Sequence, residues 1–372
     1  MMKISGTYNT AVVFNDLLDN ESRYQIQEFC NQELFRDARI RIMPDVHAGK
    51  GCVIGYTATL GRRVVPNLIG LDIGCGIQAT RLGRINPSYE KLDQFIKKHI
   101  PHGFKRNKSA DPGDYPEDFI DELRQTCHTL DIDFMDHLKG LGSLGGGNHF
   151  IEVAADSEKA KWLLIHSGSR NFGLQVATWH QSKAIRRCKE KKVEIPKHFA
   201  YLEGNDREAY IRDMKVAQRY ARLNRQEMTR RILVHLSIPA DTDQFETIHN
   251  YINFDDRIIR KGAVSAHQGE RMVIPLNMRD GSLIAYGKGN PEWNFSAPHG
   301  AGRRMSRNQA RKQLDLEDFR KGMKRVWTTT VSKKTLDEAP GAYKPKGELL
   351  KYIGESVEIS DTLQPVYNFK AG

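Results

Sequence analysis

The sequence predicts an α+β fold organised as one domain with mixed or antiparallel sheets. Short β-like runs bounded by glycines fill the opening and closing parts of the chain, and helical patterns fill much of the middle, without a regular strand–helix alternation. No Pro-rich, Gly/Ser-rich or single-sign charge tract marks a linker, and 372 residues can bury a sizeable core. We therefore expect a single domain over residues 1–372, with a helical excursion at about residues 171–240.

The expected elements follow from hydrophobic periodicity and turn residues. Alternating or continuous β-like runs lie at residues 39–60, 62–82, 149–154, 161–170 and 264–289. Helical patterns lie at residues 87–100, 116–141, 171–236, 316–326 and 347–354. Asn86 is the expected N-cap of the first of these helices, and a strand is expected at the end of the chain.

The second half of the 171–236 pattern has two distinct faces. Its apolar residues recur at helical spacing and predict a buried face: Tyr210, Met214, Ala217, Ala221, Met228 and Ile232. Its basic residues recur at the same spacing and form a stripe: Arg212, Lys215, Arg219, Arg222 and Arg225. This stripe is either a solvated face or a surface that binds phosphates.

Charge and cysteine usage narrow the class of protein. The formal net charge of +11 and pI near 9.3 fit a polyanionic partner, although simple solubility explains them equally well. Five scattered cysteines without CxxC spacing favour reduced thiols and a cytoplasmic location. No apolar N-terminal leader and no run of about 18 apolar residues occurs, so no membrane partner is expected.

Several potential metal ligands lie in glycine-rich or polar segments rather than on amphipathic faces. They are Asp72 and Cys75 in GLDIGCGI, His149 in GSLGGGNHF, His166 in HSGSR and His249 in HNY. Asp, Cys and His together can bind a divalent ion of intermediate softness, and a thiolate can bridge two ions. Any single histidine is more often structural, but the group as a whole predicts a metal centre.

The common nucleotide and protease motifs are absent from the sequence. There is no GxxxxGK[ST], no GxGxxG in a βαβ unit, no KxDG and no HExxH. The segment HGAGR offers another phosphate cradle, because small residues after His299 let backbone N–H groups approach and Arg303 adds donors. A glycine-rich turn around a buried histidine is an equally good reading of this segment.

Five segments taken together resemble the RtcB family of RNA-splicing ligases. They are MPDVHAGKG, VVPNLIGLDIGCGI, GSLGGGNHFIE, HSGSRNFG and GKGNPEWNFSAPHGAGRRMSR, in family order from about residue 40 to the terminal VYNFKAG. The resemblance implies a single ligase domain with a central metal cleft. It also implies that RNA ends with a 2′,3′-cyclic phosphate or 3′-phosphate are joined to 5′-hydroxyl ends, through a guanylated histidine and transfer of GMP to the RNA.

The resemblance also assigns cofactors and residues. It implies GTP and two Mn²⁺ ions, with Cys75 bridging, Asp72 and His149 on one ion, and His166 and His249 on the other. His299 is the implied nucleophile, and Arg170 and Asp45 are expected to face the RNA ends. The implied nucleotide-binding residues are Asn148, Phe150, Glu152, Ser282, Gly300, Ala301, Gly302, Tyr343 and Lys370, with Glu152 accepting from the guanine N1 and N2 protons.

The implied partners are broken tRNA, rRNA or other structured RNA and an archease-type activator, and no DNA is expected. The chain departs from the family pattern at Asn277, where serine is usual, at Asn171, where glycine is usual, and in being short. These departures favour a divergent branch that repairs damaged RNA. Two alternatives remain: a metal-dependent cyclic phosphodiesterase that does not ligate, and a non-catalytic RNA-binding protein that uses the basic stripe.

Overall fold

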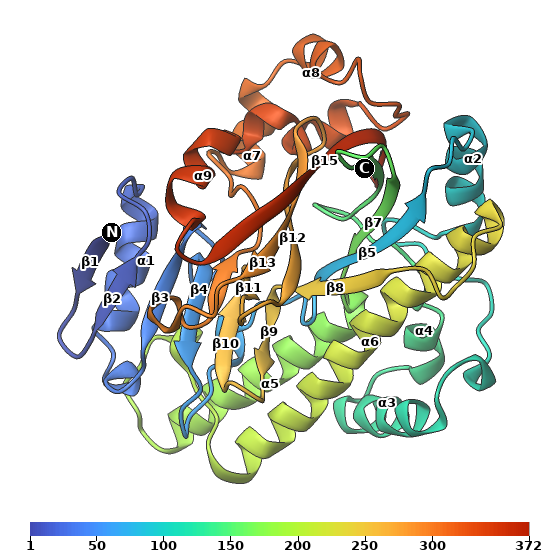
Figure 1. Ribbon diagram of the computed structural model, residues 1–372. Helices are drawn as coiled ribbons and strands as arrows, with labels where there is room; N and C mark the ends of the chain where they lie inside the picture. The colour runs from blue at the N-terminus through green and yellow to red at the C-terminus, as the bar shows by residue number, and fades with distance from the viewer. Residues whose placement is uncertain (372) are drawn as a thin grey trace.

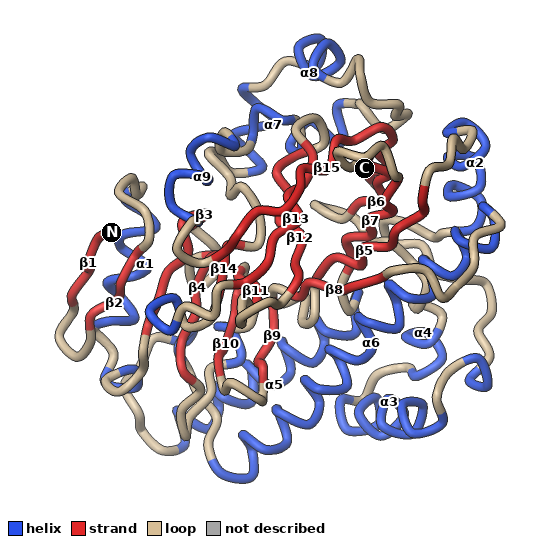
Figure 2. The backbone as a smooth tube through the Cα atoms, viewed as in Figure 1, coloured by secondary structure: helices blue, strands red, loops and turns tan. Residues whose placement is uncertain are grey.

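The computed structural model describes residues 1–371 and confirms the α+β class, with strands gathered centrally and helices around them (Figures 1 and 2). The strands are β1 (Met2–Ser5), β2 (Thr10–Val13), β3 (Ile40–His47), β4 (Ile54–Thr59), β5 (Gly76–Gly83), β6 (Phe150–Ala155), β7 (Lys161–Ser167), β8 (Gln244–Ile248), β9 (Asn250–Asn253), β10 (Ile258–Lys261), β11 (Ala263–Ser265), β12 (Arg271–Asn277), β13 (Gly281–Gly287), β14 (Ser296–Pro298) and β15 (Val357–Lys370). The helices are α1 (Asn20–Cys30), α2 (Tyr89–His99), α3 (Glu117–Leu130), α4 (Phe134–Leu138), α5 (Arg170–Glu190), α6 (Gly204–Leu236), α7 (Arg307–Gln313), α8 (Leu316–Gly322) and α9 (Lys346–Ile353).

The strands form two large sheets and one small one. The orders are β1-β2-β3-β4-β10-β9, β12-β13-β15-β6-β7-β5-β8 and β11-β14. The β2–β3 pair is parallel and the other strand pairs of residues 1–371 are antiparallel, which confirms mixed sheets. The edge strands β8 and β12 approach each other, since Val273 N donates to Thr247 Oγ1 at 3.0 Å, so the seven-stranded sheet curls into a nearly closed barrel.

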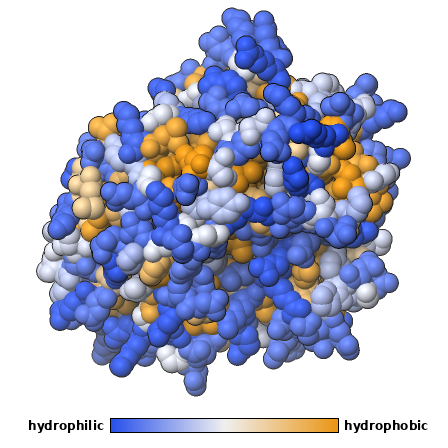
Figure 3. Space-filling model, in the orientation of Figure 1, coloured by the Kyte–Doolittle hydropathy of each residue, from blue (hydrophilic) through white to orange (hydrophobic). Residues whose placement is uncertain are grey.

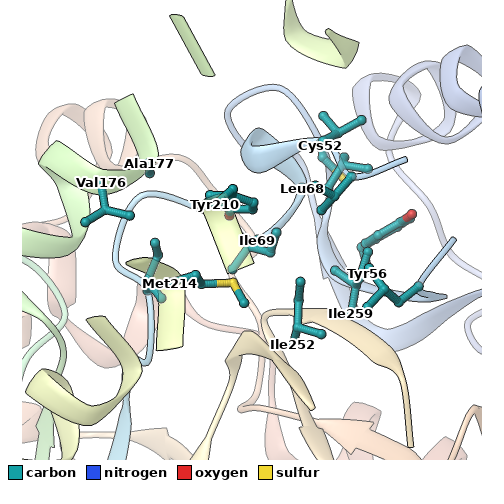
Figure 4. Close-up of a cluster of buried hydrophobic side chains, with 14 of the residues drawn as sticks. Cys52, Tyr56, Leu68, Ile69, Val176, Ala177, Tyr210, Met214, Ile252 and Ile259 are labelled. Atoms are coloured by element: carbon teal, nitrogen blue, oxygen red, sulfur yellow. The ribbon is translucent and has the colours of Figure 1, made fainter. Parts of the chain in front are cut away.

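The helices expected at about residues 171–240 form a layer that packs against the sheets. Helices α5 and α6 lie side by side beneath the strands (Figure 1), and α6 packs against β5 and β7. The predicted apolar face of α6 is buried, including Tyr210 and Met214, which face Ile69, Ile252 and Ile259 in the main core (Figure 4). Burial of this face, at about 25 cal/mol per Å² of apolar area, holds the helical layer against the sheets.

Three expected helical patterns have other boundaries in the structure. The pattern over residues 171–236 is two helices, α5 and α6, because residues 191–203 between them are not α-helical. Ser88, rather than Asn86, caps α2, because its side chain accepts from Lys91 N at 3.3 Å. The expected helix over residues 116–141 is two helices, α3 and α4, because Asp131 adopts a left-handed conformation (φ 56°) and ends α3.

Three of the five basic residues in the stripe on α6 are held in close ion pairs, whereas Lys215 is exposed without one among the described residues. Arg225 is fully buried and pairs with Glu246, which also accepts from Arg222 at 3.0 Å. Arg219 donates to Asp118 at 2.7 Å and to Glu122 at 3.1 Å. These three residues join α6 to its neighbours, so they offer little free charge to an RNA.

The five cysteines are buried and form no disulfide in the described chain. Among residues 1–371, no helix combines the length and the apolar character needed to cross a bilayer.

Candidate active site

Four candidate metal ligands meet at one end of the barrel because of strand order. Strands β6, β7, β5 and β8 are consecutive antiparallel neighbours, so the start of each lies beside the end of the next. His149 comes just before β6 and His166 lies near the end of β7. Cys75 comes just before β5 and His249 just after β8, where His249 N donates to Cys75 O at 2.9 Å.

The ligand atoms form two groups that share Cys75. One group contains Asp72, Cys75 and His149, and the other contains Cys75, His166 and His249; within each, the ligand atoms lie within 4.8 Å of one another. Cys75 Sγ lies 3.4 Å from His149 Nε2 and 3.3 Å from His166 Nε2. Cys75 therefore occupies the position of a bridge between two sites.

The contacts of the imidazole rings favour a cation at this position. His149 Nδ1 lies 2.9 Å from Leu144 O, and His166 Nδ1 lies 3.2 Å from Asn148 O. When the Nδ1–H of His166 donates to its carbonyl, the neutral ring directs its Nε2 lone pair toward Cys75, and His149 Nε2 lies 3.0 Å from Asp72 Oδ2. The Nε2 atoms of His166 and His249 also lie only 3.0 Å apart. Converging lone pairs in a buried site are what a divalent ion stabilises, so these residues fit a metal.

Burial and neighbouring charges shift the pKa values of the candidate ligands. Burial lowers the pKa of His166 and of His249 well below the usual value, so both are neutral ligands. Burial, reinforced by the charge of Asp72, raises the pKa of the Cys75 thiol well above its usual value. Burial also acts to raise the pKa of Asp72, but the hydrogen bond and charge of His149 bring it below its usual range.

Backbone geometry lets Asp72 reach this position. Ser169 N donates to Asp72 Oδ1 at 3.0 Å. A Cβ on Gly168 would collide with the Asp72 carboxylate, so only glycine fits there. Asn224 on α6 in turn donates to Gly168 O at 3.0 Å, and the long helix thereby supports the loop that carries Asp72.

His299 lies beside the metal-ligand groups and is bonded to a buried carboxylate. It follows β14, its ring centroid is 4.8 Å from that of His249, and its Nδ1 lies 2.6 Å from Asp45 Oδ2. Asp45 has no solvent exposure, and its Oδ1 has no partner among the described residues. A ring whose Nδ1–H donates to a carboxylate keeps its lone pair on Nε2, which is the state of a nucleophilic histidine.

A cavity of about 780 Å³ adjoins His299 and is large enough for a nucleotide. Every residue expected to bind the nucleotide lines it: Asn148, Phe150, Glu152, Ser282, Gly300, Ala301, Gly302, Tyr343 and Lys370. Its wall also includes His166, His249 and His299. Gly302 has φ 76°, and a Cβ there would collide with the backbone of Asp45, so glycine lets the two segments meet.

Glu152 is an incompletely bonded carboxyl group in this cavity. Asn368 Nδ2 donates to its Oε2 at 2.7 Å, whereas its Oε1 is buried without a partner among residues 1–371. Burial raises the pKa of Glu152 to about 8. A ligand that donates two hydrogen bonds would satisfy this group and stabilise its ionised form.

Known proteins of one family are similar in sequence to most of this chain. The family model for tRNA-splicing ligase RtcB matches residues 32–371. RNA-splicing ligase RtcB of Escherichia coli (strain K12) is 33% identical, over 88% of each chain. The tRNA-splicing ligase RtcB of Nanoarchaeum equitans is 26% identical over 84% of each chain, and RNA-splicing ligase RtcB2 of E. coli (strain ATCC 25922) is 27% identical over 89% of this chain and 88% of its own.

The chain belongs to the RtcB family.

Two residues of this RtcB-family chain, Asp45 and Arg170, lie elsewhere than the resemblance implied, whereas Arg303 of the HGAGR segment lines the cavity. Asp45 does not face an open RNA site, because it is buried under His299. Arg170 lies at the start of α5 with its guanidinium bound to Ser143 Oγ at 3.0 Å and Gly103 O at 2.7 Å, outside the cavity wall. Arg303 also donates to Met305 O at 3.2 Å and pairs with Glu338.

Glu338 is a buried charged residue of the cavity wall that the sequence did not reveal. Its carboxylate accepts from Lys370 Nζ at 2.8 Å and from Tyr343 OH at 2.5 Å, and it pairs with Arg307 at 2.9 Å. Burial acts to raise its pKa, but Lys370, Arg307 and Arg303 lower it to about 2. Glu338 lies in a 3-10 turn (Lys333–Glu338) without a motif or periodic pattern, so no sequence signal marked it.

The unusual Asn277 of this RtcB-family chain closes a hairpin turn. Its Oδ1 accepts from Arg279 N at 3.0 Å and Asp280 N at 2.9 Å, and its Nδ2 donates to Asp280 Oδ2 at 2.8 Å. Asn277 and Ser282 both line the cavity. The altered loop therefore retains an ordered wall for a nucleotide.

Proposed function

We propose that this chain is an RNA ligase that joins 2′,3′-cyclic phosphate or 3′-phosphate ends of RNA to 5′-hydroxyl ends. In this proposal GTP first guanylates His299, GMP then passes to the RNA 3′-phosphate, and the 5′-hydroxyl displaces GMP. Membership of a family whose members are named tRNA-splicing and RNA-splicing ligases supports RNA ligation. GTP, manganese and the guanylated histidine rest on the motifs and on the site chemistry.

The observation that carries this proposal is the bond between His299 and Asp45 at the cavity wall. Asp45 holds the proton on Nδ1, so Nε2 can attack the α-phosphorus of a nucleotide as pyrophosphate leaves. The developing positive charge on the imidazole is balanced by the buried carboxylate 2.6 Å away. The proton on Nδ1 stays with the His299–Asp45 pair throughout, as the orienting bond requires.

Two Mn²⁺ ions would be held by Asp72, Cys75 and His149, and by Cys75, His166 and His249. When bound, such ions would neutralise charge on the reacting phosphates and orient them.

The chemistry of the cavity wall supports a guanine nucleotide. Ionised Glu152 can accept from the guanine N1–H and N2–H groups, and adenine lacks both of these donors. Adenine would leave the buried Glu152 acceptor unpaired, so such a site discriminates strongly against adenine. Lys370 lies 5.4 Å above the ring of Phe150 and adds positive charge at the same wall.

The substrate is proposed to be broken tRNA, rRNA or another structured RNA, in splicing or in repair, with help from an archease-type activator in the cytoplasm. The departures at Asn277 and Asn171 favour repair. The alternative of a non-catalytic RNA-binding protein loses support, because Arg219, Arg222 and Arg225 of the basic stripe are engaged in ion pairs.

The decisive experiment incubates the protein with α-labelled GTP and Mn²⁺ and measures acid-labile label on the polypeptide. We expect label on the wild type and on a control variant, His267→Ala, which alters a half-exposed histidine outside the cavity. His299→Ala should carry no label and keep the wild-type circular dichroism spectrum. Absence of label on a wild type that binds manganese would contradict autonomous ligation. Opening of a cyclic-phosphate RNA without GTP would then favour the phosphodiesterase.

A further inference from the structure

A basic hollow of about 640 Å³ lies on another part of the molecule, at the flank that carries α2 (Figure 1). The end of α2, residues 101–108 and the end of α6 form its wall. None of its lining residues is Asp or Glu. Six of its basic residues are Lys97, Lys98, Lys105, Arg106, Lys108 and Arg230.

Part of the positive charge in the hollow is not neutralised by ion pairs. Lys97 pairs with Asp93 at 2.8 Å, Arg106 with Asp136, and Arg230 with Glu227 at 2.8 Å. Lys98, Lys105 and Lys108 are exposed and have no ion-pair partner among residues 1–371. In this respect the hollow differs from the ion-paired part of the stripe on α6.

Phe104 projects from the segment that carries Lys105 and Lys108. Its side chain is 105% exposed relative to the reference value, so it packs against nothing else in the described chain. By contrast, Phe95 in the hollow stacks with His235 at 4.1 Å and with His99 at 4.8 Å between centroids. Phe104 therefore offers an unoccupied aromatic face among cations. The face of the molecule seen in Figure 3 is mainly hydrophilic, with separate apolar patches.

The backbone beneath Phe104 is anchored on both sides. Gly103 N donates to Gly145 O at 2.8 Å. Asn107 Nδ2 donates to Leu141 O at 2.6 Å, and Arg231 donates to Asn107 Oδ1 at 2.9 Å. These hydrogen bonds hold the backbone of the segment in place, so little backbone conformational entropy is lost when a ligand binds.

Residues 101–108 are hydrogen-bonded to residues that lie next to the candidate metal centre. Arg170 Nη2 donates to Gly103 O at 2.7 Å. Leu144 N donates to Pro101 O at 2.8 Å, and Leu144 O is the atom that holds His149 Nδ1. An RNA strand whose broken end lies at the metal centre can therefore continue along residues 101–108.

We infer that residues 101–108 and this hollow bind single-stranded RNA next to the break, with Phe104 stacking on a base and Lys105 and Lys108 binding phosphates. Aromatic stacking combined with unpaired cations is the usual chemistry of single-strand recognition. The inference rests on the proposed function, because that function places an RNA end at the metal centre.

The test measures the affinity of the full-length protein for a fluorescent single-stranded RNA that ends in a 3′-phosphate, by anisotropy at several salt concentrations. Phe104→Ala should raise Kd about tenfold, and Phe104→Trp should keep it near the wild-type value. The control Tyr8→Ala lies in the β1–β2 connection, at the opposite flank from α2 in Figure 1, and should leave Kd unchanged.

Charge reversal provides a second, independent measurement. The double variant Lys105→Glu/Lys108→Glu should reduce the slope of log affinity against log salt by about 1.4, which corresponds to two lost phosphate contacts on single-stranded RNA. The matched double variant Lys189→Glu/Lys192→Glu has the same charge change and spacing at the exposed end of α5, and it should keep the slope.

Wild-type Kd and slope in the Phe104 and Lys105/Lys108 variants would overturn the inference, as would equal losses in the matched controls. Labelling with GMP should be normal in all of these variants, because none of the changed residues lines the nucleotide cavity. A wild type that takes no label would contradict the proposed function instead, and the RNA affinities would still decide on the binding site.

Discussion

The substitution Asp45→Asn tests whether the carboxylate under His299 activates it. The variant keeps the size of the side chain and removes its charge. Asp45 has no solvent exposure and its Oδ2 lies 2.6 Å from His299 Nδ1, so water does not screen the pair. A hydrogen bond to a charged group contributes about 1.5–3 kcal/mol, and burial favours the upper part of this range.

We expect the rate of GMP labelling to fall roughly 30- to 150-fold, which corresponds to about 2–3 kcal/mol in the activation free energy. Stability should change little. The carboxylate already has one unpaired oxygen, and the amide can still accept from Nδ1, so we expect the free energy of unfolding to change by less than about 1 kcal/mol. The assay is the initial rate of labelling from α-labelled GTP, with thermal unfolding measured on the same preparations.

The chain contains a matched control for this substitution. Asp213 Oδ2 lies 2.7 Å from His180 Nε2, both residues are buried, and neither lines the nucleotide cavity. Asp213→Asn should therefore label at the wild-type rate. Labelling of Asp45→Asn at the wild-type rate would refute the reasoning, and so would an equal loss in Asp213→Asn, which would indicate a general effect on the fold.

Three further predictions follow from the site and its support. Burial raises the pKa of Glu152 to about 8, so between about pH 4.5 and pH 8 the folded, nucleotide-free protein keeps a proton on this carboxyl group that the unfolded chain has released. The free energy of unfolding should therefore fall as the pH rises through this range. GTP affinity should rise over the upper part of this range, and Glu152→Gln should remove both trends in thermal-shift titrations. Manganese at 100 times its Kd should stabilise the wild type by about 2.7 kcal/mol in thermal unfolding, and Cys75→Ser should abolish most of this shift. Arg225→Ala should lower the free energy of unfolding in denaturant by about 3 kcal/mol, because it leaves the largely buried Glu246 with only half-exposed Arg222 as partner. A loss under about 1 kcal/mol would contradict this.

The pH dependence of the Arg225 effect has a definite sign. Burial acts to raise the pKa of Glu246, but Arg225 and Arg222 bring it below its usual value. The contribution of this ion pair is therefore present above the unfolded pKa of about 4.3 and is lost as the pH falls through the lower folded value. Arg225→Ala should accordingly cost less stability at pH 3 than at pH 7.

Local patterns in the sequence predicted many of the elements and the buried face of one helix, but not every element or boundary. The apolar spacing of Tyr210 and Met214 predicted the buried face of α6, because a helix brings residues three and four apart to one side. The left-handed break at Asp131 had no such pattern, since the conformation of one residue decides whether two helical runs join.

The candidate ligands were visible as residue types in glycine-rich turns, but their convergence was not. Cys75 and His249 are brought together by the order of four antiparallel strands, and no local pattern encodes the order of strands in a sheet. The same holds for the bond between Asp45 and His299, which are 254 positions apart.

The sequence by itself determined the fold class and the family, and it supplied the candidate residues for metal binding and for attack on a phosphate. The tertiary structure alone decided which charges are free. Lys105 and Arg225 are both basic in the sequence, yet one is exposed in a hollow without acidic lining and the other is buried against Glu246. The energy of a charge depends on its distance to partners and to water, and these distances are created only when segments far apart in the chain pack together.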